Sequence, residues 1–464
     1  MKRLHFRNLN RSPSCSAVTT GFVLVALCGA PFQSQAQTER SEEITYNSHV
    51  AGIINENCVV CHREGGIAPM QFTSYEQVRP WAPIIGYRVG RREMPPYAYD
   101  QGIGIQDLLG DWRLEQDEID TILAWVEQGA PLGNPDIVPP QAEIPSLDEW
   151  NFTAEFGQPD LVLASEPIDI PAVGNDMWHR PYTLTGLNDT RCIKAMQVKP
   201  RGVAKSVVHH ANSSVEVPKD DGSFERFSQL TEYAMGKWGE VMPEGVCRTL
   251  PANGRIAWDI HMYPGGLGAM APGEMIENNV VELGVWFYDE GYEEVAKYKQ
   301  DLRLYRMGAQ EDLVIPPHGY EMTQGFHSFD HPVRIDSFQP HGHLRMRAAS
   351  FEIFYPDTGR TEPISQISNW SATWHHSHLY APDVAPLVPA GAVLVLKQWY
   401  DNTDKNPNNP DPDLWVMGGS RTADEMTHAW LAVTHLDEAG YQALLAEREQ
   451  GEESEAAELT SRID

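Results

Sequence analysis

Two patterns of hydrophobic and polar residues divide the chain. Before residue 139, apolar side chains recur at the spacing of amphipathic helices, and Gly129 and Pro131 follow as helix-ending residues. The helical positions are Val50, Ile53, Ile54, Ile119, Ile122, Leu123 and Val126. From about residue 152 to 437, short runs alternate apolar and polar side chains between Gly, Pro, Asn and Asp. We therefore expect a small all-α domain followed by a longer β region.

The alternating runs predict individual strands. In Arg255–Tyr263, bulky apolar residues occupy every second position, and Asp259 and His261 fall on the opposite face. Further strands are expected at Val280–Tyr288, Ala392–Tyr400 and Ala429–Leu436. Strands at such spacing indicate sandwiches or barrels, and the region is long enough for two such domains with a break near residues 300–318.

Composition narrows the functional classes. The 37 glycines and 34 prolines favour turn-rich β structure over helical bundles. The formal net charge of −30 argues against nucleic acid and anionic membrane surfaces as partners.

Residues 140–151 are expected to form a Pro-rich linker. Residues 441–464 form an acidic tail, and a short, fraying helix is expected from about residue 438.

The N-terminus has the features of a Sec-type signal peptide. Lys2, Arg3 and Arg7 are basic, an apolar run spans residues 17–32, and Ser34-Gln35-Ala36 fits a small-x-small cleavage site. We expect residues 1–36 to be removed and the protein to be periplasmic or secreted. No integral membrane span is expected after that removal.

The spacing Cys58-x-x-Cys61-His62 is typical of a covalently attached haem c. The two thiols bind the haem, and the imidazole becomes an axial iron ligand. Half of a zinc site is the alternative, but a second pair of ligands is needed and no cysteine follows before Cys192. Residues 37–139 are therefore expected to form a c-type cytochrome domain with one haem.

The second axial ligand is expected from a methionine. Cytochrome c domains commonly place it in a Pro-flanked loop before the last helix, and Met94 in Met94-Pro95-Pro96 resembles that arrangement. Met70 is the competing candidate.

Several histidines have ligand-like spacings. His341 and His343 would share one face of a strand, whereas the adjacent His209 and His210 can meet one ion only at a strand end or bulge. His261 could complete that second site from a neighbouring strand. Each histidine alone would be read as an ordinary surface or core residue. Together, in an exported haem-linked chain, they indicate a metal site, with copper favoured.

The order of these motifs resembles the ascorbate-dependent type II copper monooxygenases, the family of peptidylglycine α-hydroxylating and dopamine β-hydroxylating enzymes. The resemblance is closer to bacterial proteins that join a c-type cytochrome to that module. The match to the copper module covers roughly residues 185–437, and the cytochrome match covers residues 45–135. It rests on His209-His210, His261, His341-x-His343, Asp424-Glu425-Met426, Tyr400-Asp401-Asn402-Thr403, Asn406–Pro412 and Gly418–Thr422.

The resemblance implies two antiparallel β-sandwich, jelly-roll-like domains, at residues 152–310 and 311–440, and two copper ions. It implies an electron-transfer copper at His209, His210 and His261. An O₂-activating copper would lie at His341, His343 and the thioether of Met426. No catalytic residue beyond these ligands is implied. Cys192 and Cys247 remain for a disulfide in an oxidising compartment, and the family has one in a comparable place.

The expected function is insertion of one oxygen atom from O₂ into a small-molecule substrate. The haem would supply electrons and be refilled by a periplasmic redox carrier or an ascorbate-like reductant. Three alternatives stay open: an oxidoreductase that passes electrons from substrate to haem, a non-catalytic electron-transfer module, and a structural zinc protein. The cluster His375-His376-x-His378 fits a third metal site, part of a substrate pocket, or a surface patch.

Overall fold

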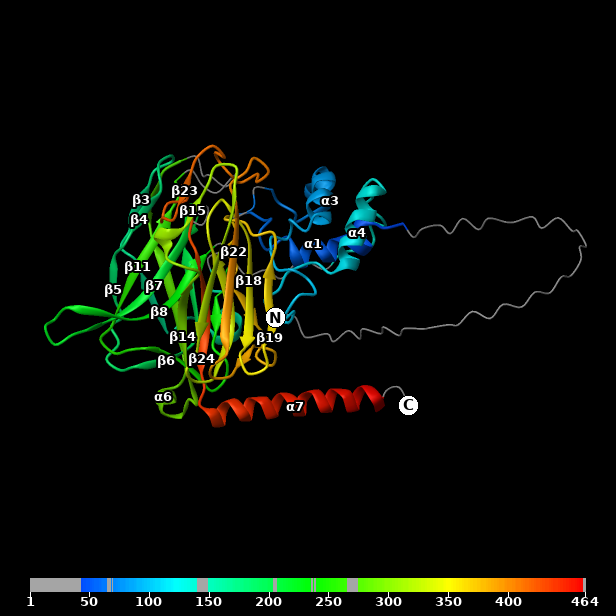
Figure 1. Cartoon of the computed structure of the whole chain (residues 1–464). Coiled ribbons are helices and arrows are strands. Elements are labelled where there is room, and N and C mark those ends of the chain that lie inside the picture. Colours follow the sequence, from blue (N-terminus) through cyan, green and yellow to red (C-terminus); the bar gives the residue numbers. More distant parts are fainter. Residues whose placement is uncertain are drawn as a thin grey trace, which may run out of the picture. The chain divides into compact units, whose positions relative to one another are not determined.

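The computed structural model describes residues 43–64, 68, 70–139, 149–202, 207–234, 237, 239–264 and 274–461. The predicted signal peptide, and the predicted linker up to residue 148, lie outside these residues. Within them the protein is mainly β, with a small helical region at the N-terminal end (Figure 1). No helix in the described ranges is long and apolar enough to cross a membrane.

The helical region contains the amphipathic helices expected from the sequence. Helix α4 begins after Glu115, which forms a capping box with Glu118, and ends before Gly129 (φ 87°). Ile122 and Trp125 of α4 are fully buried against Val50 and other apolar residues. The elements are η1 Tyr46–Val50 (a π-helix), α1 Ala51–Asn57, α2 Tyr75–Val78, η2 Arg79–Trp81, α3 Ala82–Gly90 and α4 Gln116–Glu127.

The remaining helices accompany the strands. The C-terminal α7 has 24 residues and is longer than the short helix expected there. Its Glu- and Ala-rich sequence consists of good helix formers, which explains its length. These helices are α5 Thr153–Phe156, α6 Tyr292–Val295, η5 Gln310–Asp312 and α7 Glu438–Ser461.

Strands dominate the chain from residue 161 onward, and all four strands expected from alternation are present as β11, β13, β22 and β24. The first-half strands are β1 Leu108–Leu109, β2 Leu161–Ala164, β3 Ile168–Ile170, β4 Met177–His179, β5 Tyr182–Leu184, β6 Arg191–Pro200, β7 Val208–Pro218, β8 Phe224–Ala234, β9 Glu240–Val241, β10 Val246–Leu250, β11 Arg255–Met262, β12 Ile276–Asn279 and β13 Val281–Phe287. The others are β14 Tyr298–Arg306, β15 Val314–Ile315, β16 Tyr320–Ser328, β17 Val333–His341, β18 Met346–Tyr355, β19 Arg360–Ile367, β20 His378–Tyr380, β21 Leu387–Val388, β22 Val393–Asp401, β23 Val416–Met417 and β24 His428–His435.

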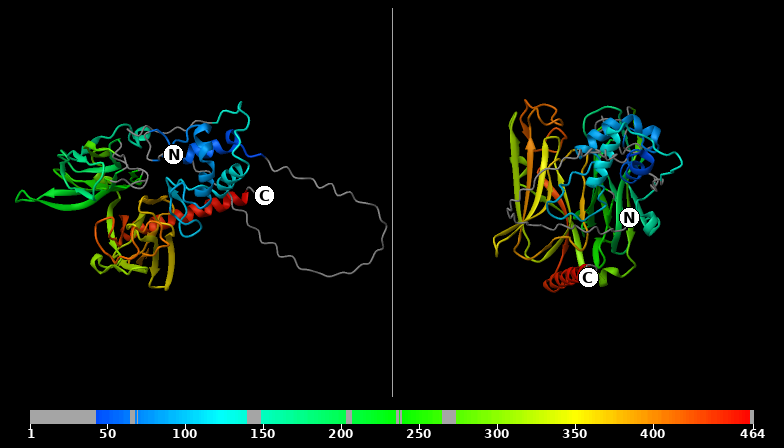
Figure 2. Two further views of the ribbon diagram at one scale, coloured as in Figure 1. Left: turned by 90° about the horizontal axis from the view of Figure 1, so that it is seen from above. Right: turned by 90° about the vertical axis from the view of Figure 1, so that its right-hand side faces the viewer.

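These strands form one large mixed sheet of 16 strands, a four-stranded sheet β16-β22-β18-β19, and two short pairs. The larger sheet runs through β17-β24-β14-β10-β6, and it carries the β8-β7-β11 group as a branch. β14 pairs with β24 from Lys299 to Arg306 and is parallel to β10, so it belongs to both halves of the β region. Figure 2 shows the green strands and the yellow-to-orange strands as two groups.

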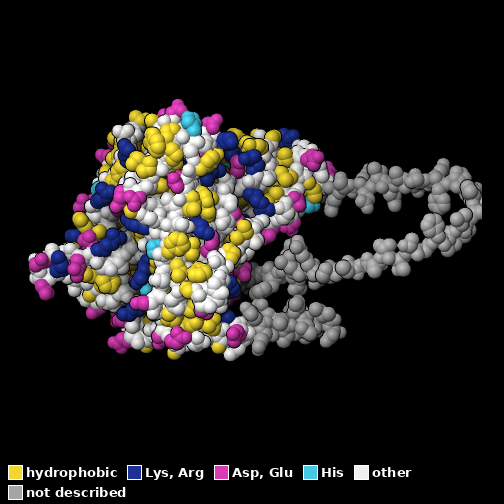
Figure 3. Space-filling model, in the orientation of Figure 1, with side chains coloured by type: hydrophobic (Ala, Val, Ile, Leu, Met, Phe, Trp, Pro, Cys, Tyr) yellow, Lys and Arg dark blue, Asp and Glu magenta, His cyan; other side chains and the backbone are white. Residues whose placement is uncertain are grey.

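Two apolar clusters fill the interior of the β region. In the first, Trp258 and Ile260 of β11 pack with Met196 of β6 and Leu283 of β13. In the second, residues of β17 and β24 pack on β18 and β22, with the rings of Phe338 and Phe351 5.6 Å apart. Apolar burial at both places drives the folding of each half. Acidic and basic side chains are interspersed on the face drawn in Figure 3.

The predicted cytochrome segment contributes to the second cluster. Tyr97 and Tyr99 are buried in it, and β1 pairs with β20. The hydroxyl of Tyr99 donates to the Ile105 carbonyl at 2.7 Å and lies 2.9 Å from Ser365 Oγ. The polypeptide that follows Met94 is therefore anchored on the β region.

The predicted disulfide is present. Cys192 of β6 and Cys247 of β10 are bonded, and the two strands are direct neighbours in the sheet. The bond closes a loop of 55 residues that contains His209 and His210.

A buried polar network joins the two halves through β14. Gln300, 4% exposed, accepts from Arg248 Nη2 at 2.6 Å and donates to Asp336 Oδ2 at 2.5 Å. Arg334 and Thr434 also donate to Asp336, and Arg248 pairs with Glu240 at 2.6 Å. Because buried charges are stable only when they are paired, this network fixes β10 relative to β17 and β24.

Gln300→Leu tests that link. The substitution removes the group between the Arg248 guanidinium and the Asp336 carboxylate and leaves both buried with fewer partners. We expect a loss of about 2–4 kcal/mol in the free energy of unfolding, measured by urea denaturation. The matched control Gln324→Leu, at an exposed position of β16, should change it by less than about 0.5 kcal/mol. Equal effects of the two substitutions would contradict the role assigned to Gln300.

Candidate metal centre

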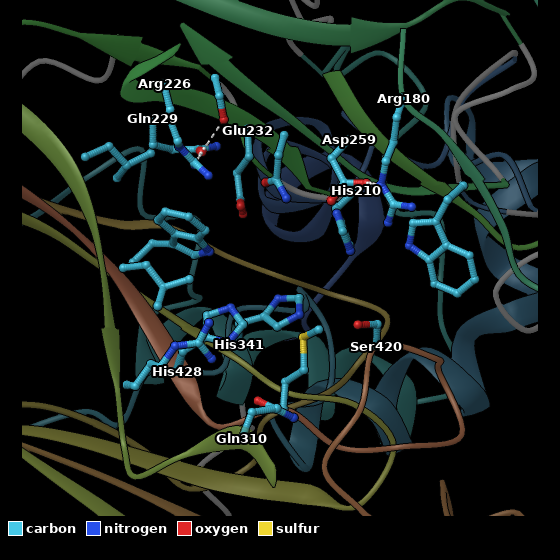
Figure 4. Close-up of a pocket in the computed structure, with 18 of the residues that line it drawn as sticks. Arg180, His210, Arg226, Gln229, Glu232, Asp259, Gln310, His341, Ser420 and His428 are labelled. Atoms are coloured by element: carbon cyan, nitrogen blue, oxygen red, sulfur yellow. Dashed lines mark hydrogen bonds and ion pairs between the residues drawn. The ribbon is translucent and has the colours of Figure 1, made fainter. Parts of the chain in front are cut away.

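Seven buried histidines gather where the two halves of the β region meet. All are at most 9% exposed, and they come from β7, β11, β17, β24 and the loops beside them: His209, His210, His261, His341, His343, His375 and His428. A cavity of about 910 Å³ reaches this cluster. In Figure 4, His210 lies on one wall of the cavity and His341 and His428 lie on the facing wall.

A β-bulge explains how two adjacent histidines reach one place. His261 of β11 pairs with His210, but the next residue, Met262, pairs with Val208. His209 is therefore the extra residue, and the bulge cancels the alternation that would send the two imidazoles to opposite faces. Their ring centres lie 5.3 Å apart, and each is within 5.2 Å of the His261 ring.

The first set, His209, His210 and His261, has the geometry of a metal site. Ligand atoms from the three imidazoles lie within 4.8 Å of one another. His209 Nε2 donates to the Ala372 carbonyl at 3.1 Å, and His261 Nε2 donates to Asp176 Oδ1 at 3.2 Å. The two Nδ1 atoms then carry lone pairs and face each other at 3.3 Å. Two imidazole nitrogens on one tetrahedral ion are roughly 3.3 Å apart, so this set could hold a metal ion.

The second set is positioned by a buried glutamate. Glu425 is fully buried and accepts from the backbone N–H groups of His343 at 2.7 Å and Arg345 at 2.5 Å. Burial raises the pKa of Glu425 to about 7, and these N–H groups act in the opposite direction. His343 Nδ1 donates to the Asp424 carbonyl at 3.1 Å, which turns Nε2 inward. Among the described residues, that Nε2 is buried and has no hydrogen-bond partner.

Met426 lies beside this second set. It lines the same cavity as His341, and its carbonyl accepts from the Tyr400 hydroxyl at 2.8 Å. Gly342 separates the two histidines, and a Cβ there would meet Met346 Sδ at 2.4 Å. The turn therefore requires glycine for reasons of packing.

One carboxylate links the two sets. Asp176 accepts from His261, and it also accepts from the Thr422 hydroxyl at 3.0 Å and the Thr422 N–H at 3.1 Å. Thr422 lies in the loop whose Asp424 carbonyl holds His343. Carboxylates that accept from a ligand histidine fix its ring and its tautomer. Asp176 thereby ties the orientation of His261 to the position of the second set.

Burial favours the neutral form of four of these imidazoles, those of His209, His210, His341 and His343. It lowers the pKa of His209 to about 3 and that of His343 to about 4, and the neighbouring imidazole His261 adds to the effect. The pKa values of His210 and His341 are lowered well below the ordinary value for the same first cause. The neutral form is the one that binds metals.

The two sets are close together, which the sequence did not indicate. The rings of His210 and His341 lie 5.6 Å apart, and those of His209 and His343 lie 6.4 Å apart. Two further residues of the cluster were missed as members of it. His428 stacks on His341 at 4.7 Å, and His375 lies between the sets. In the sequence, the spacing His375-His376-x-His378 pointed to His375 as a possible member of the cluster. Nothing in the sequence pointed to Asp176.

Three of the four predicted haem residues, Cys58, Cys61 and His62, directly follow α1. Among the described residues Cys58 and Cys61 are free thiols and are not bonded to each other. His62 Nδ1 donates to the Met70 carbonyl at 3.0 Å, and the ring stacks on Phe72 at 4.2 Å. Met94 is half-buried in the loop that follows α3.

Comparisons with known proteins leave the family open. No protein-family model matches the chain, and no curated protein matches it. Among solved structures, the major capsid protein P2 from bacteriophage PM2 is similar at 11% identity over 60% of this chain and 98% of its own, with a TM-score of 0.23. An allantoicase is similar at 8% identity over 49% and 79%, with a TM-score of 0.14. The VP2 subviral particle of infectious bursal disease virus gives 9% identity over 62% and 74%, with a TM-score of 0.17. These similarities are too weak to assign a family.

Proposed function

We propose that the protein is an exported copper-dependent monooxygenase that inserts one oxygen atom from O₂ into an organic substrate. In this proposal residues 152–310 and 311–440 are two jelly-roll-like β-sandwich domains that carry the ligands, and a fused c-type cytochrome domain supplies electrons. The observation that carries the proposal is that members of both predicted ligand sets, His210 of the first and His341 and Met426 of the second, line one cavity.

The donor set suits copper. The facing lone pairs of His209 and His261 are repulsive unless a cation lies between them. The second set combines two imidazoles with a thioether, a soft ligand that favours Cu(I) over zinc. When bound, copper at these sites would deliver electrons to O₂ and the haem would replace them.

The protein's own residues would then hold the substrate. The cavity is bordered by apolar Leu302, Leu304 and Trp430 and by the Arg180–Asp259 ion pair at 2.8 Å. It is large enough for a small organic molecule. A molecule with an apolar part and a polar end fits this lining.

The motif near α1 suits haem c. The Cys58 and Cys61 thiols are available for thioether bonds, and the Met70 carbonyl fixes His62 so that Nε2 remains for iron. Because Met70 holds the opposite edge of the His62 ring, it is poorly placed to bind iron on the other side of a haem. Met94 is therefore the better candidate for the second axial ligand.

A direct contact favours electron entry from the cytochrome segment. His376 Nε2 donates to the carbonyl of Pro96, two residues from Met94. The His376 ring also lies 5.2 Å from the Tyr97 ring, and His375 of the metal cluster is its neighbour in the chain. The loop proposed to bind the haem thus contacts the segment that enters the histidine cluster.

Metal analysis of the exported protein tests the cofactors. We expect two copper ions and one haem iron per chain, with the haem retained after acid–acetone extraction because it is covalent. His210→Ala and His343→Ala should each lose about one copper. His331→Ala, at a histidine outside the cluster, should lose none. Zinc at full occupancy in place of copper would contradict the proposal.

Isotope labelling tests the reaction. With ¹⁸O₂ and a screen of small organic molecules, we expect one labelled oxygen atom in the product. His343→Ala should abolish incorporation and slow the reoxidation of pre-reduced haem by O₂ and substrate, because the ligand set beside the cavity is broken. Unlabelled product would instead favour an oxidoreductase that passes electrons from substrate to haem. Haem reoxidation that is indifferent to His343→Ala would contradict a role of the second set.

A further inference from the structure

His375 is buried among the metal-site histidines without a role in either predicted ligand set. It is 1% exposed and lies in the loop between β19 and β20. Within the part of the chain that the structure describes, neither Nδ1 nor Nε2 of His375 has a hydrogen-bond partner. Each buried polar group left without a partner costs about 1–3 kcal/mol. A neutral imidazole always has one nitrogen that donates and one that accepts, so both needs are unmet.

The surroundings of the ring indicate what its accepting nitrogen binds. The His375 ring centre lies 4.7 Å from His209 of the first set and 4.8 Å from His341 of the second. Two imidazoles on one ion, each with a bond of about 2 Å, have ring centres roughly 4.5–5.4 Å apart. Both neighbouring planes are steeply inclined, at 67° and 90°, unlike the stacked pair His341 and His428 at 20°. Both distances lie in the range for a shared ion.

We propose that His375 is a further metal ligand: it lies between the two predicted ligand sets and gives the lone pair of one ring nitrogen to an ion held by one of them. The assignment rests on the proposed copper chemistry for the identity of the metal. It does not depend on oxygen insertion. Residues on both sides of His375 hold its ring in place: the Trp370 ring lies 5.2 Å from it, and the neighbouring His376 donates a hydrogen bond to the Pro96 carbonyl.

A matched control exists three residues away. His378 is 2% exposed, and its Nδ1 also has no hydrogen-bond partner among the described residues. Its ring packs on Tyr97 at 5.0 Å and Tyr99 at 4.9 Å. Replacing it perturbs the same segment and removes an equally buried imidazole, but one that lies among tyrosines.

The test is the copper affinity and spectrum of the full-length protein. Copper(I) is titrated against a chromophoric chelator, and the EPR spectrum of the copper(II) form is recorded. His375→Ala and the bulkier His375→Gln should weaken binding of at least one copper by roughly tenfold or more. Both should change the EPR spectrum, and added imidazole should restore the affinity of His375→Ala. His378→Ala should keep the wild-type affinity and spectrum.

Wild-type copper affinity and EPR spectra in both His375 variants would overturn the assignment and leave a buried water as the partner of the ring. If His375→Ala does not fold, His375→Gln and its spectrum decide the question. Failure of ¹⁸O insertion in a wild-type protein that shows the expected His375 dependence would refute the proposed reaction and leave the ligand assignment standing.

Discussion

The candidate centre depends on buried imidazoles whose inward-facing nitrogens are turned toward one another. Each ring is held by a hydrogen bond from the nitrogen that points away from the other imidazoles. The acceptors are the Ala372 carbonyl for His209, Asp176 for His261 and the Asp424 carbonyl for His343. Such an arrangement turns hydrogen-bond acceptors toward one common point. It is unfavourable in itself and becomes favourable when a cation occupies that point.

Two separate groups of hydrogen bonds fix the position of one ligand set relative to the other. At the cluster, Asp176 connects His261 to the loop that carries Asp424, Glu425 and Met426. Deeper in the sheet, Gln300 connects Arg248 of β10 to Asp336 of β17. β14 supplies the backbone pairing between the same halves. The distances between the sets are therefore a property of the sheet as well as of the histidines.

Local features were predictable because they depend on short-range patterns. The periodicity of residues 116–127 predicts α4, and the alternation of Arg255–Tyr263 predicts β11. The adjacent pair His209-His210 requires either a strand end or a bulge, and the structure contains the bulge. The Cys192–Cys247 disulfide also matches the expectation. The proximity of the two sets, and the places of His428, Asp176 and Glu425, depend on contacts between residues more than eighty positions apart. No local pattern encodes such contacts.

The position of the segment after Met94 also could not be predicted from local sequence patterns. Its residues follow a helical region in sequence, yet Tyr97 and Tyr99 are buried in the β region.

The most direct test of the centre is anomalous diffraction at the copper edge from crystals of the copper-loaded protein. We predict one peak among His209, His210 and His261 and a second at His341, His343 and Met426, both beside His375. Copper bound elsewhere, or no anomalous peak among the buried histidines, would contradict the assignment of this cluster as the metal centre.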